Sequence, residues 1–202
     1  MNKKAIYNLT YGLFVLTARC GEKDNGCIIN TAGQVTSTPN RISITVNKDN
    51  FTHDMIMESG KFNISILSEA ADFDTFKHFG FQSGKNVDKF EGYSAAKRSE
   101  NGIYYITEGT NAYISASVEQ TIDLGTHTMF VADVTDMEVL KEEPSVTYDF
   151  YQSNIKPKQE KTEKKKGYIC KICGYIYEGD PLPEDFICPI CKHGAADFEK
   201  LS

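Results

Sequence analysis

Residues 167–202 of this 202-residue chain read GYICKICGYIYEGDPLPEDFICPICKHGAADFEKLS and contain four cysteines in two Cys-x-x-Cys pairs. The pairs are Cys170 with Cys173 and Cys188 with Cys191, and 14 residues separate them. A Cys-x-x-Cys turn directs both sulfurs towards one point, so two facing turns form a tetrahedral site of four sulfurs. Such a site suits Zn²⁺ or iron. The spacing therefore predicts that these cysteines bind a metal and organise the fold of the segment.

The cysteines alone leave two metals open. A zinc ribbon has nearly the same spacing and would be a structural site, whereas iron would make the site redox-active. A segment of 36 residues buries little apolar surface. With either metal, the ion is therefore expected to supply much of the folding free energy of this segment.

The residues around the cysteines resemble rubredoxin, in which one iron cycles between its ferric and ferrous states. The shared pattern is C-x-x-C-G-Y-x-Y, then C-P-x-C, then D-F-E-K at residues 197–200. The resemblance implies an iron site and a small aromatic core made of Tyr175, Tyr177, Phe186 and Phe198. Two features depart from the family. The segment between the pairs is short, and Lys192 stands where glycine commonly follows, a position that lysine adopts only at a steric cost.

Charge is distributed unevenly along the chain. Residues 1–153 hold 13 basic and 20 acidic residues, for a net charge of −7, and residues 167–202 hold three and six, for −3. Between them, residues 154–166 hold six lysines and two glutamates, for +4. The two acidic segments argue against a nucleic acid partner. The lysine-rich segment is interpreted as a solvated linker, with a patch for an acidic partner as the alternative.

Membrane and export signals are weak in this sequence. No apolar run approaches the roughly 18 residues that a membrane span needs, and Arg19 before Cys20 does not suit a signal-peptide cleavage site. Outside the metal site only Cys20 and Cys27 remain, too few for a disulfide framework, and both are interpreted as buried structural thiols. The sequence predicts a cytoplasmic protein with no membrane partner.

Short strands dominate residues 11–140. Apolar and polar residues alternate at 42–46, 62–66 and 112–118, and further strands are predicted at 14–17, 26–31, 103–107, 128–134 and 137–140. Two short helices are predicted, one over 52–59 with Thr52 or Asn50 as N-cap and one from the cap Asp72 to Gly80. The pattern predicts a mainly β domain, a closed or split barrel with helical insertions.

The segment from Asn30 to Pro39, NTAGQVTSTP, lies between two predicted strands and is rich in hydroxyl and amide groups. Its hydroxyl, amide and backbone groups would present hydrogen-bond donors along a groove. The alternative is a solvated hairpin loop. No Gly-x-Gly-x-x-Gly or P-loop motif is present, so a nucleotide cofactor would be bound by other means.

Several of these stretches, taken in order, resemble the flavin reductase-like FMN-binding split barrel. They are GCIINT at 26–31, QVTS at 34–37, VNKDNFTHD at 46–54, FQSGKNVDKF at 81–90 and GTHTMF at 125–130. The resemblance implies a split β-barrel over residues 1–153, the linker over 154–166 and a rubredoxin-like domain over 167–202. It also implies FMN and a homodimer.

By this resemblance, two groups of residues would bind the cofactor. The isoalloxazine ring and the start of the phosphate site would be lined by Asn30, Thr31, Gln34, Val35, Thr36 and Ser37. The phosphate site would be completed by Asn47, Lys48, Asn50, Thr52, His53, Ser83, Gly84, Lys85 and Lys89. The N-terminus of a helix near Thr52 offers free N–H groups to an anion. Taken alone, Lys85 and Lys89 are typical surface lysines.

His127 is the candidate catalytic residue. A lone histidine in a strand is usually a core or surface residue, but the resemblance places it near the flavin or the nicotinamide. The fusion resembles high-molecular-weight rubredoxins, which implies electron flow from NAD(P)H through FMN to the four-cysteine iron and on to a flavodiiron protein. The alternatives are a pure FMN and iron carrier loaded by a separate reductase, and a zinc-ribbon protein without redox activity.

Overall fold

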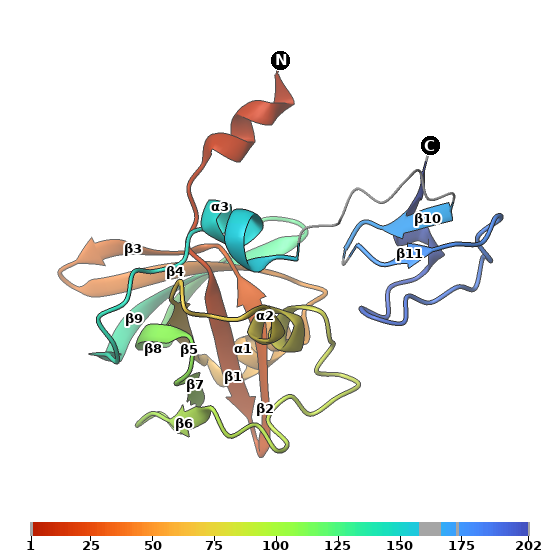
Figure 1. Cartoon of the computed structure of the whole chain (residues 1–202). Helices are drawn as coiled ribbons and strands as arrows, with labels where there is room; N and C mark the ends of the chain where they lie inside the picture. The colour runs from red at the N-terminus through yellow and green to blue at the C-terminus, as the bar shows by residue number, and fades with distance from the viewer. Residues whose placement is uncertain (1, 158–166, 173, 202) are drawn as a thin grey trace. The chain divides into compact units, whose positions relative to one another are not determined.

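The structure, a computed structural model, describes residues 2–157, 167–172 and 174–201 (Figure 1). It divides into two compact units, residues 1–156 and residues 157–202. Cys173 and most of the predicted linker, residues 158–166, lie outside the described residues. Asn154 and Ile155, at the start of the predicted linker, belong to the last helical turn of the first unit. The predicted domain boundaries stay predictions.

The first unit is mainly β, as predicted. Its strands are β1 (Phe14–Cys20), β2 (Lys23–Ile29), β3 (Ala32–Ser37), β4 (Asn40–Asn47), β5 (Lys61–Leu67), β6 (Ala96–Arg98), β7 (Tyr104–Ile106), β8 (Thr110–Asp123) and β9 (His127–Val139). Its helices are η1 (Lys3–Asn8), α1 (Phe51–Ser59), α2 (Phe73–Gly80), α3 (Tyr148–Phe150) and the π-helical η2 (Tyr151–Ile155). None of the described helices is long and apolar enough to cross a membrane.

Seven strands form one antiparallel sheet in the order β2-β1-β5-β8-β9-β4-β3. The sheet surrounds a core to which β1 contributes Leu16, β4 contributes Ile44 and β9 contributes Phe130, all with 0% exposure. Because the edge strands β2 and β3 do not pair with each other, the barrel stays open. The fold is therefore the split barrel rather than the closed one.

Strand β3 forms one edge of this sheet and pairs only with β4 (Figure 1). The pairing shifts register between Gln34 and Thr36, which is a β-bulge at Val35. All side chains of β3 after Ala32 are exposed. This segment was predicted as a polar loop or groove wall, and the loop interpretation is wrong over residues 32–37, because hydrogen bonds to β4 hold it extended.

The two main helices begin and end where their capping residues predict. The Asn50 side chain accepts a hydrogen bond from the Thr52 N–H and begins α1, while Gly60, at φ 68°, ends it. The Asp72 side chain accepts from the Thr75 N–H and begins α2. On α2, Phe76 and Phe79 are buried in a second core cluster with Val15 of β1. Because Val15 and Leu16 point to opposite faces, β1 is buried on both sides.

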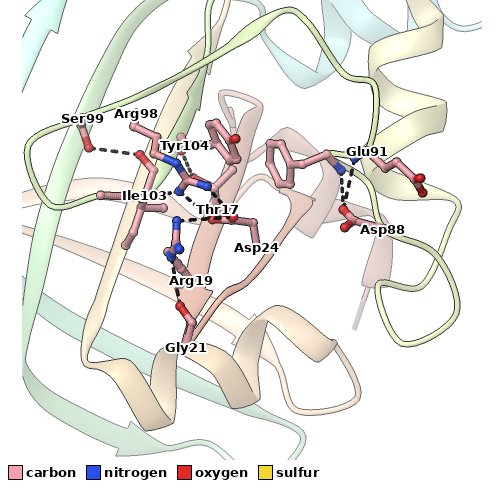
Figure 2. Close-up of polar contacts among 12 residues, drawn as sticks. Thr17, Arg19, Gly21, Asp24, Asp88, Glu91, Arg98, Ser99, Ile103 and Tyr104 are labelled. Carbon is pink, nitrogen blue, oxygen red and sulfur yellow. Dashed lines mark hydrogen bonds and ion pairs between the residues drawn. The ribbon is translucent and has the colours of Figure 1, made fainter.

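A partly exposed ion cluster attaches the β6–β7 hairpin to β2. Figure 2 shows Arg98 and Arg19 converging on Asp24, whose side chain is 9% exposed. The Arg98 guanidinium donates to both oxygens of Asp24, at 3.1 and 2.8 Å, and lies 3.8 Å over the ring of Tyr104. On that same ring stacks Phe90, at 4.7 Å between centroids. The cluster thus also holds the loop that precedes β6.

Replacing Arg98 with alanine is expected to lower the free energy of unfolding of the first unit by roughly 1–3 kcal/mol. The reason is that the almost buried Asp24 carboxylate would keep only Arg19, whose nearest nitrogen is 3.8 Å away. Urea denaturation followed by circular dichroism measures the loss. Arg98→Lys should restore only part of it, because an ammonium lacks the planar fork of the guanidinium. Full restoration by lysine would contradict this explanation.

The second unit is a small three-stranded sheet in the order β11-β10-β12. Its elements are β10 (Gly167–Cys170), β11 (Ile176–Tyr177), η3 (Ala195–Asp197) and β12 (Phe198–Leu201). The predicted aromatic core is confirmed. Phe186 lies at its centre, with ring centroids 4.6 Å from Tyr177, 5.3 Å from Phe198 and 6.4 Å from Tyr175.

Candidate metal and cofactor sites

The structure brings three of the predicted metal ligands together. The sulfurs of Cys170, Cys188 and Cys191 all lie within 4.8 Å of one another, and the Sγ atoms of Cys170 and Cys191 are 3.5 Å apart. The three residues are 1%, 0% and 5% exposed. Sulfurs around a tetrahedral metal at about 2.3 Å stand roughly 3.8 Å apart, so this arrangement fits a four-sulfur site. The fourth predicted ligand, Cys173, lies outside the described residues.

Cys170 and Cys188 each begin a turn, and the two turns have the same hydrogen bonds. In the first turn, the Cys170 N–H donates to the Tyr175 carbonyl at 2.8 Å and the Gly174 N–H donates to the Cys170 carbonyl at 2.9 Å. In the second turn, the Cys188 N–H donates to the His193 carbonyl at 2.8 Å and the Lys192 N–H donates to the Cys188 carbonyl at 2.9 Å. The two halves of the site are thus built as copies of one another.

The copies differ at the residue after the second cysteine of each pair. Gly174 has φ 79° and Lys192 has φ 63°, so both adopt the left-handed conformation. Among the described residues, Lys192 is the only non-glycine with a positive φ. The left-handed conformation costs an L-residue about 1–2 kcal/mol. The steric cost predicted for Lys192 from the sequence is therefore present in the structure.

The predicted ring-binding residues lie on β3 and just before it. The Thr31 hydroxyl donates to the Thr45 carbonyl at 2.5 Å, and Asn30 is partly buried beside it. Beyond them, Gln34 donates to the Asn40 side chain at 3.1 Å. The exposed set Gln34, Val35, Thr36 and Ser37 lies along the open edge of the sheet. Since an edge strand leaves alternate N–H and C=O groups unpaired, β3 offers donors and acceptors that suit the polar edge of a flavin ring.

A second group meets at the N-terminal end of α1. Asn47 pairs with His127 in the register of β4 and β9, and Lys48 binds Asp123 at 2.7 Å, which lowers the pKa of that carboxyl. His53 is buried, and its Nε2 lies 2.9 Å from the Thr128 hydroxyl. The candidate catalytic residue His127 is half-buried at this corner, with Nδ1 2.9 Å from the Thr126 hydroxyl. The cation and the helix end suit a phosphate.

Asn25 connects two further predicted residues, although no pattern in the sequence singles it out. Its side chain is 1% exposed and donates from Nδ2 to the Thr52 hydroxyl at 2.9 Å. A Cβ atom at Gly84 would lie 2.1 Å from Asn25 Oδ1, so the loop backbone rests directly against this amide. The Oδ1 atom itself has no hydrogen-bond partner in the described structure. Thr52 and Gly84 thus both contact the buried side chain of Asn25 on β2.

The lysines of the loop at residues 81–90 have different surroundings. Lys85 is exposed next to Ser83, as a surface lysine would be. Lys89 is 2% exposed, and its ammonium donates to the Gly26 carbonyl at 2.8 Å and the Phe79 carbonyl at 2.9 Å. Burial lowers the pKa of Lys89 from 10.5 to about 8. Through these two hydrogen bonds Lys89 fixes the loop to the barrel. Its role in phosphate binding stays a prediction.

The contribution of Lys89 to the stability of the first unit is expected to rise between about pH 8 and pH 10, while the buried Cys27 thiol, whose pKa burial raises, contributes the opposite trend from about pH 9. The folded pKa of Lys89 is about 8 and its ordinary pKa is 10.5, so in this interval this residue binds more protons in the unfolded chain than in the folded one. Above about pH 10 the trend reverses, since burial raises the pKa of Tyr93 to about 12. Urea midpoints measured from pH 7 to 10 test this. Lys89→Met should gain less stability, or lose more, than the native protein between pH 8 and 10, and an identical pH dependence in the two proteins would contradict this assignment.

The ring-binding group extends along β4 away from the α1 group. Ser37 lies opposite Asn40, whereas Asn47 and His127 are seven residues further along. At about 3.3 Å per residue, the hairpin tip and the α1 end are separated by roughly 23 Å. The structure therefore brings Thr31 close to the α1 group through Thr45, but it does not bring Ser37 there.

Two cavities of the first unit differ in how they relate to the predicted site residues. An apolar groove of about 360 Å³ is lined by Gln34 together with Phe14, Ile64 and Met137, among others. A more polar cavity of about 600 Å³ beside α2 is lined by Asp72, His78, Tyr93 and Glu108, among others, and by none of the predicted site residues. Of the two, only the apolar groove touches the predicted flavin region.

Comparison with known families and proteins agrees with both halves of this description. The flavin reductase like domain family matches residues 6–157, and the rubrerythrin, rubredoxin-like domain family matches residues 168–199. The high molecular weight rubredoxin of Moorella thermoacetica is 39% identical over the full length of both chains. A ferric-chelate reductase (NAD(P)H) of Archaeoglobus fulgidus is 36% identical, over 80% of this chain and 95% of that protein.

Solved structures support the fold. The NADH:FAD oxidoreductase of Streptomyces globisporus superposes with a TM-score of 0.65 at 22% identity, covering 72% of this chain and 85% of that one.

Proposed function

The chain belongs to the flavin reductase-like family in the form that ends in a rubredoxin-like domain, and from this premise we propose that it oxidises NAD(P)H and passes the electrons through FMN and its own iron to an external acceptor protein. The observation that carries the proposal is the buried three-sulfur cluster of Cys170, Cys188 and Cys191 on the same chain as a flavin reductase-like barrel. FMN accepts two electrons at once from a nicotinamide and releases them singly, and a four-cysteine iron accepts one at a time.

The residues of the barrel would bind and orient FMN. Donors on the edge of β3 would face the pyrimidine side of the ring, where reduction places negative charge. Lys48 and the N-terminal end of α1 would hold the phosphate, and Asn25 would keep Thr52 and Gly84 in place beside it. His127, at the same corner, would face the nicotinamide. The name of the Archaeoglobus relative, which specifies NAD(P)H, supports the choice of donor.

We also propose that the protein is a homodimer. Several large apolar side chains of the first unit are exposed, namely Val35 (49%), Leu124 (51%), Met137 (59%) and Val139 (72%). They lie on β3, on β9 and in the turn between β8 and β9. The hairpin tip with Ser37 stands roughly 23 Å from the α1 end of its own chain. A second copy would cover the apolar side chains and would bring a hairpin tip to the partner's site.

The proposed acceptor is a flavodiiron-type protein, as the resemblance to high-molecular-weight rubredoxins implies. A specific acceptor should oxidise the reduced iron at a rate that saturates with acceptor concentration. Mixing the reduced protein with a purified flavodiiron protein and following the iron absorbance tests this. A rate that stays linear up to high concentration would indicate non-specific electron transfer and would contradict the assignment of this acceptor.

Anaerobic stopped-flow mixing with NADH or NADPH tests the main proposal. We expect the flavin absorbance to bleach first and the iron absorbance to follow. If neither nicotinamide bleaches either cofactor while dithionite bleaches both, the protein is a carrier loaded by a separate reductase. A colourless protein with zinc by elemental analysis would instead identify a protein without redox activity.

A further inference from the structure

The second cysteine turn carries a lysine where the first carries a glycine, although the two turns make the same hydrogen bonds. Gly174 and Lys192 occupy equivalent left-handed positions, each directly after a cysteine of the site. Glycine adopts this conformation without strain, whereas lysine is strained there. Glycine at position 192 would remove this backbone strain. The presence of lysine therefore suggests that its side chain has a role of its own.

The charge of Lys192 is not balanced locally. Its side chain is exposed, and it forms no ion pair with any residue in the described part of the chain. Neither turn, residues 170–174 or 188–193, contains Asp or Glu, while all six Asp and Glu residues of the segment 167–202 lie between 178 and 185 or between 197 and 199. By contrast, Lys200 of the same unit is paired with Asp180 at 2.8 Å. An unpaired cation therefore stands next to a metal ligand.

We propose that the positive charge of Lys192 raises the reduction potential of the iron. Reduction adds one electron, converts ferric to ferrous iron, and takes the site of four thiolates from a net charge of −1 to −2 without breaking a bond or moving a proton. A nearby cation stabilises the more negative state more than the less negative one. In this chain the electron comes from NAD(P)H by way of the flavin, so Lys192 makes the iron a better acceptor for it.

This inference deepens the proposed function and rests on iron in the four-cysteine site. It does not depend on the reaction with nicotinamide, because the iron can be reduced electrochemically with mediators. A failure of the NAD(P)H experiment would leave the potential of the iron measurable, so the two proposals can fail separately.

The test compares three substitutions in the full-length protein by spectroelectrochemical titration of the iron absorbance. Lys192→Arg keeps the charge, Lys192→Gln removes it but keeps a side chain, and Lys192→Gly also relieves the backbone. We expect Arg to match the native protein. Gln and Gly should both lower the equilibrium constant for reduction, by a factor of roughly two to ten, and added salt should shrink the difference. Metal content is measured for each variant.

Lys200→Gln is the matched control, because it removes the same charge from the same unit at a position outside both turns. It should leave the potential of the iron within the scatter of repeated titrations. A native potential in Lys192→Gln would overturn the proposal. A change confined to Lys192→Gly would overturn it as well, since the backbone would then be the cause. An equal shift in Lys200→Gln would show a general effect of net charge and would also count against it.

Discussion

Cys188→Ser is expected to abolish the iron centre and to unfold the second unit. Cys188 is fully buried among the sulfurs, and a serine hydroxyl does not ionise near neutral pH to replace a thiolate ligand. The unit has only a small aromatic core around Phe186, so the metal supplies much of its folding free energy. Iron content should fall to below about a tenth of the native value, which the visible spectrum and elemental analysis measure.

The first unit should survive this substitution, because it has its own core around Leu16 and Phe130. Limited proteolysis should then remove the second unit and leave a fragment that ends near residue 157. Cys20→Ser is the matched control, since Cys20 lies at the end of β1 and is a free cysteine of the first unit. It should keep all the iron. A Cys188→Ser protein with a native iron spectrum would contradict the four-cysteine site.

Gly84→Ala is expected to weaken FMN binding by a factor of about ten or more and to destabilise the first unit by roughly 1–3 kcal/mol. The new Cβ would lie 2.1 Å from Asn25 Oδ1, and this short, buried side chain has little room to move. The loop would therefore lift away from β2, and Thr52 would lose its alignment with the loop. Titration of FMN fluorescence with the flavin-free protein measures the affinity.

A double substitution separates this overlap from other effects. Asn25→Ala removes the three atoms nearest to the new Cβ, so adding Gly84→Ala to it should cost little more. Gly194→Ala should leave FMN binding unchanged. Gly194 belongs to the second unit, and a Cβ added there would meet no atom within 4 Å. Fully additive losses in the double variant would show that Gly84 does not act through Asn25. If Gly84→Ala bound FMN with native affinity, the loop at residues 81–90 would not contribute to FMN binding.

The sequence was sufficient for features that depend on local chemistry. Cap residues such as Asn50 and Asp72 defined where α1 and α2 begin, because the bonds involved span two or three residues. The Cys-x-x-Cys turns defined the metal site for the same reason, and three of its four ligands are placed together in the described structure. Alternation at 42–46 and 62–66 defined β4 and β5, although only β4 has a single buried face, while β5 also buries its polar residues Asn63 and Ser65.

Features that depend on distant partners were missed. Strand β3 lacks apolar alternation and is extended only because β4 pairs with it. The predicted break between residues 134 and 137 is wrong, because β9 runs on through a bulge and Asp136 still pairs with Ser115 of β8. Cys20 is only partly buried, against the prediction, whereas Cys27 is buried as predicted.

The site residues show the same limit. A lysine in a polar loop predicts a surface side chain, yet Lys89 finds two carbonyls in the interior that no local pattern reveals. Asn25 could have been noticed only as a polar residue facing the core side of a strand, and its partners Thr52 and Gly84 are far away in sequence. Such residues become visible only when the chain is folded.

The bulge at Val35 has a consequence for how the protein behaves when it is concentrated. An exposed edge strand can recruit identical strands one after another, which is how fibres and amorphous aggregates begin. The register shift between Gln34 and Thr36 breaks the regular spacing of the free N–H and C=O groups of β3, so a second flat strand cannot continue the pattern along its whole length. The bulge would thus limit strand-by-strand aggregation while leaving the polar groups of β3 free for the cofactor that we propose it binds. Deleting Val35 would remove that protection.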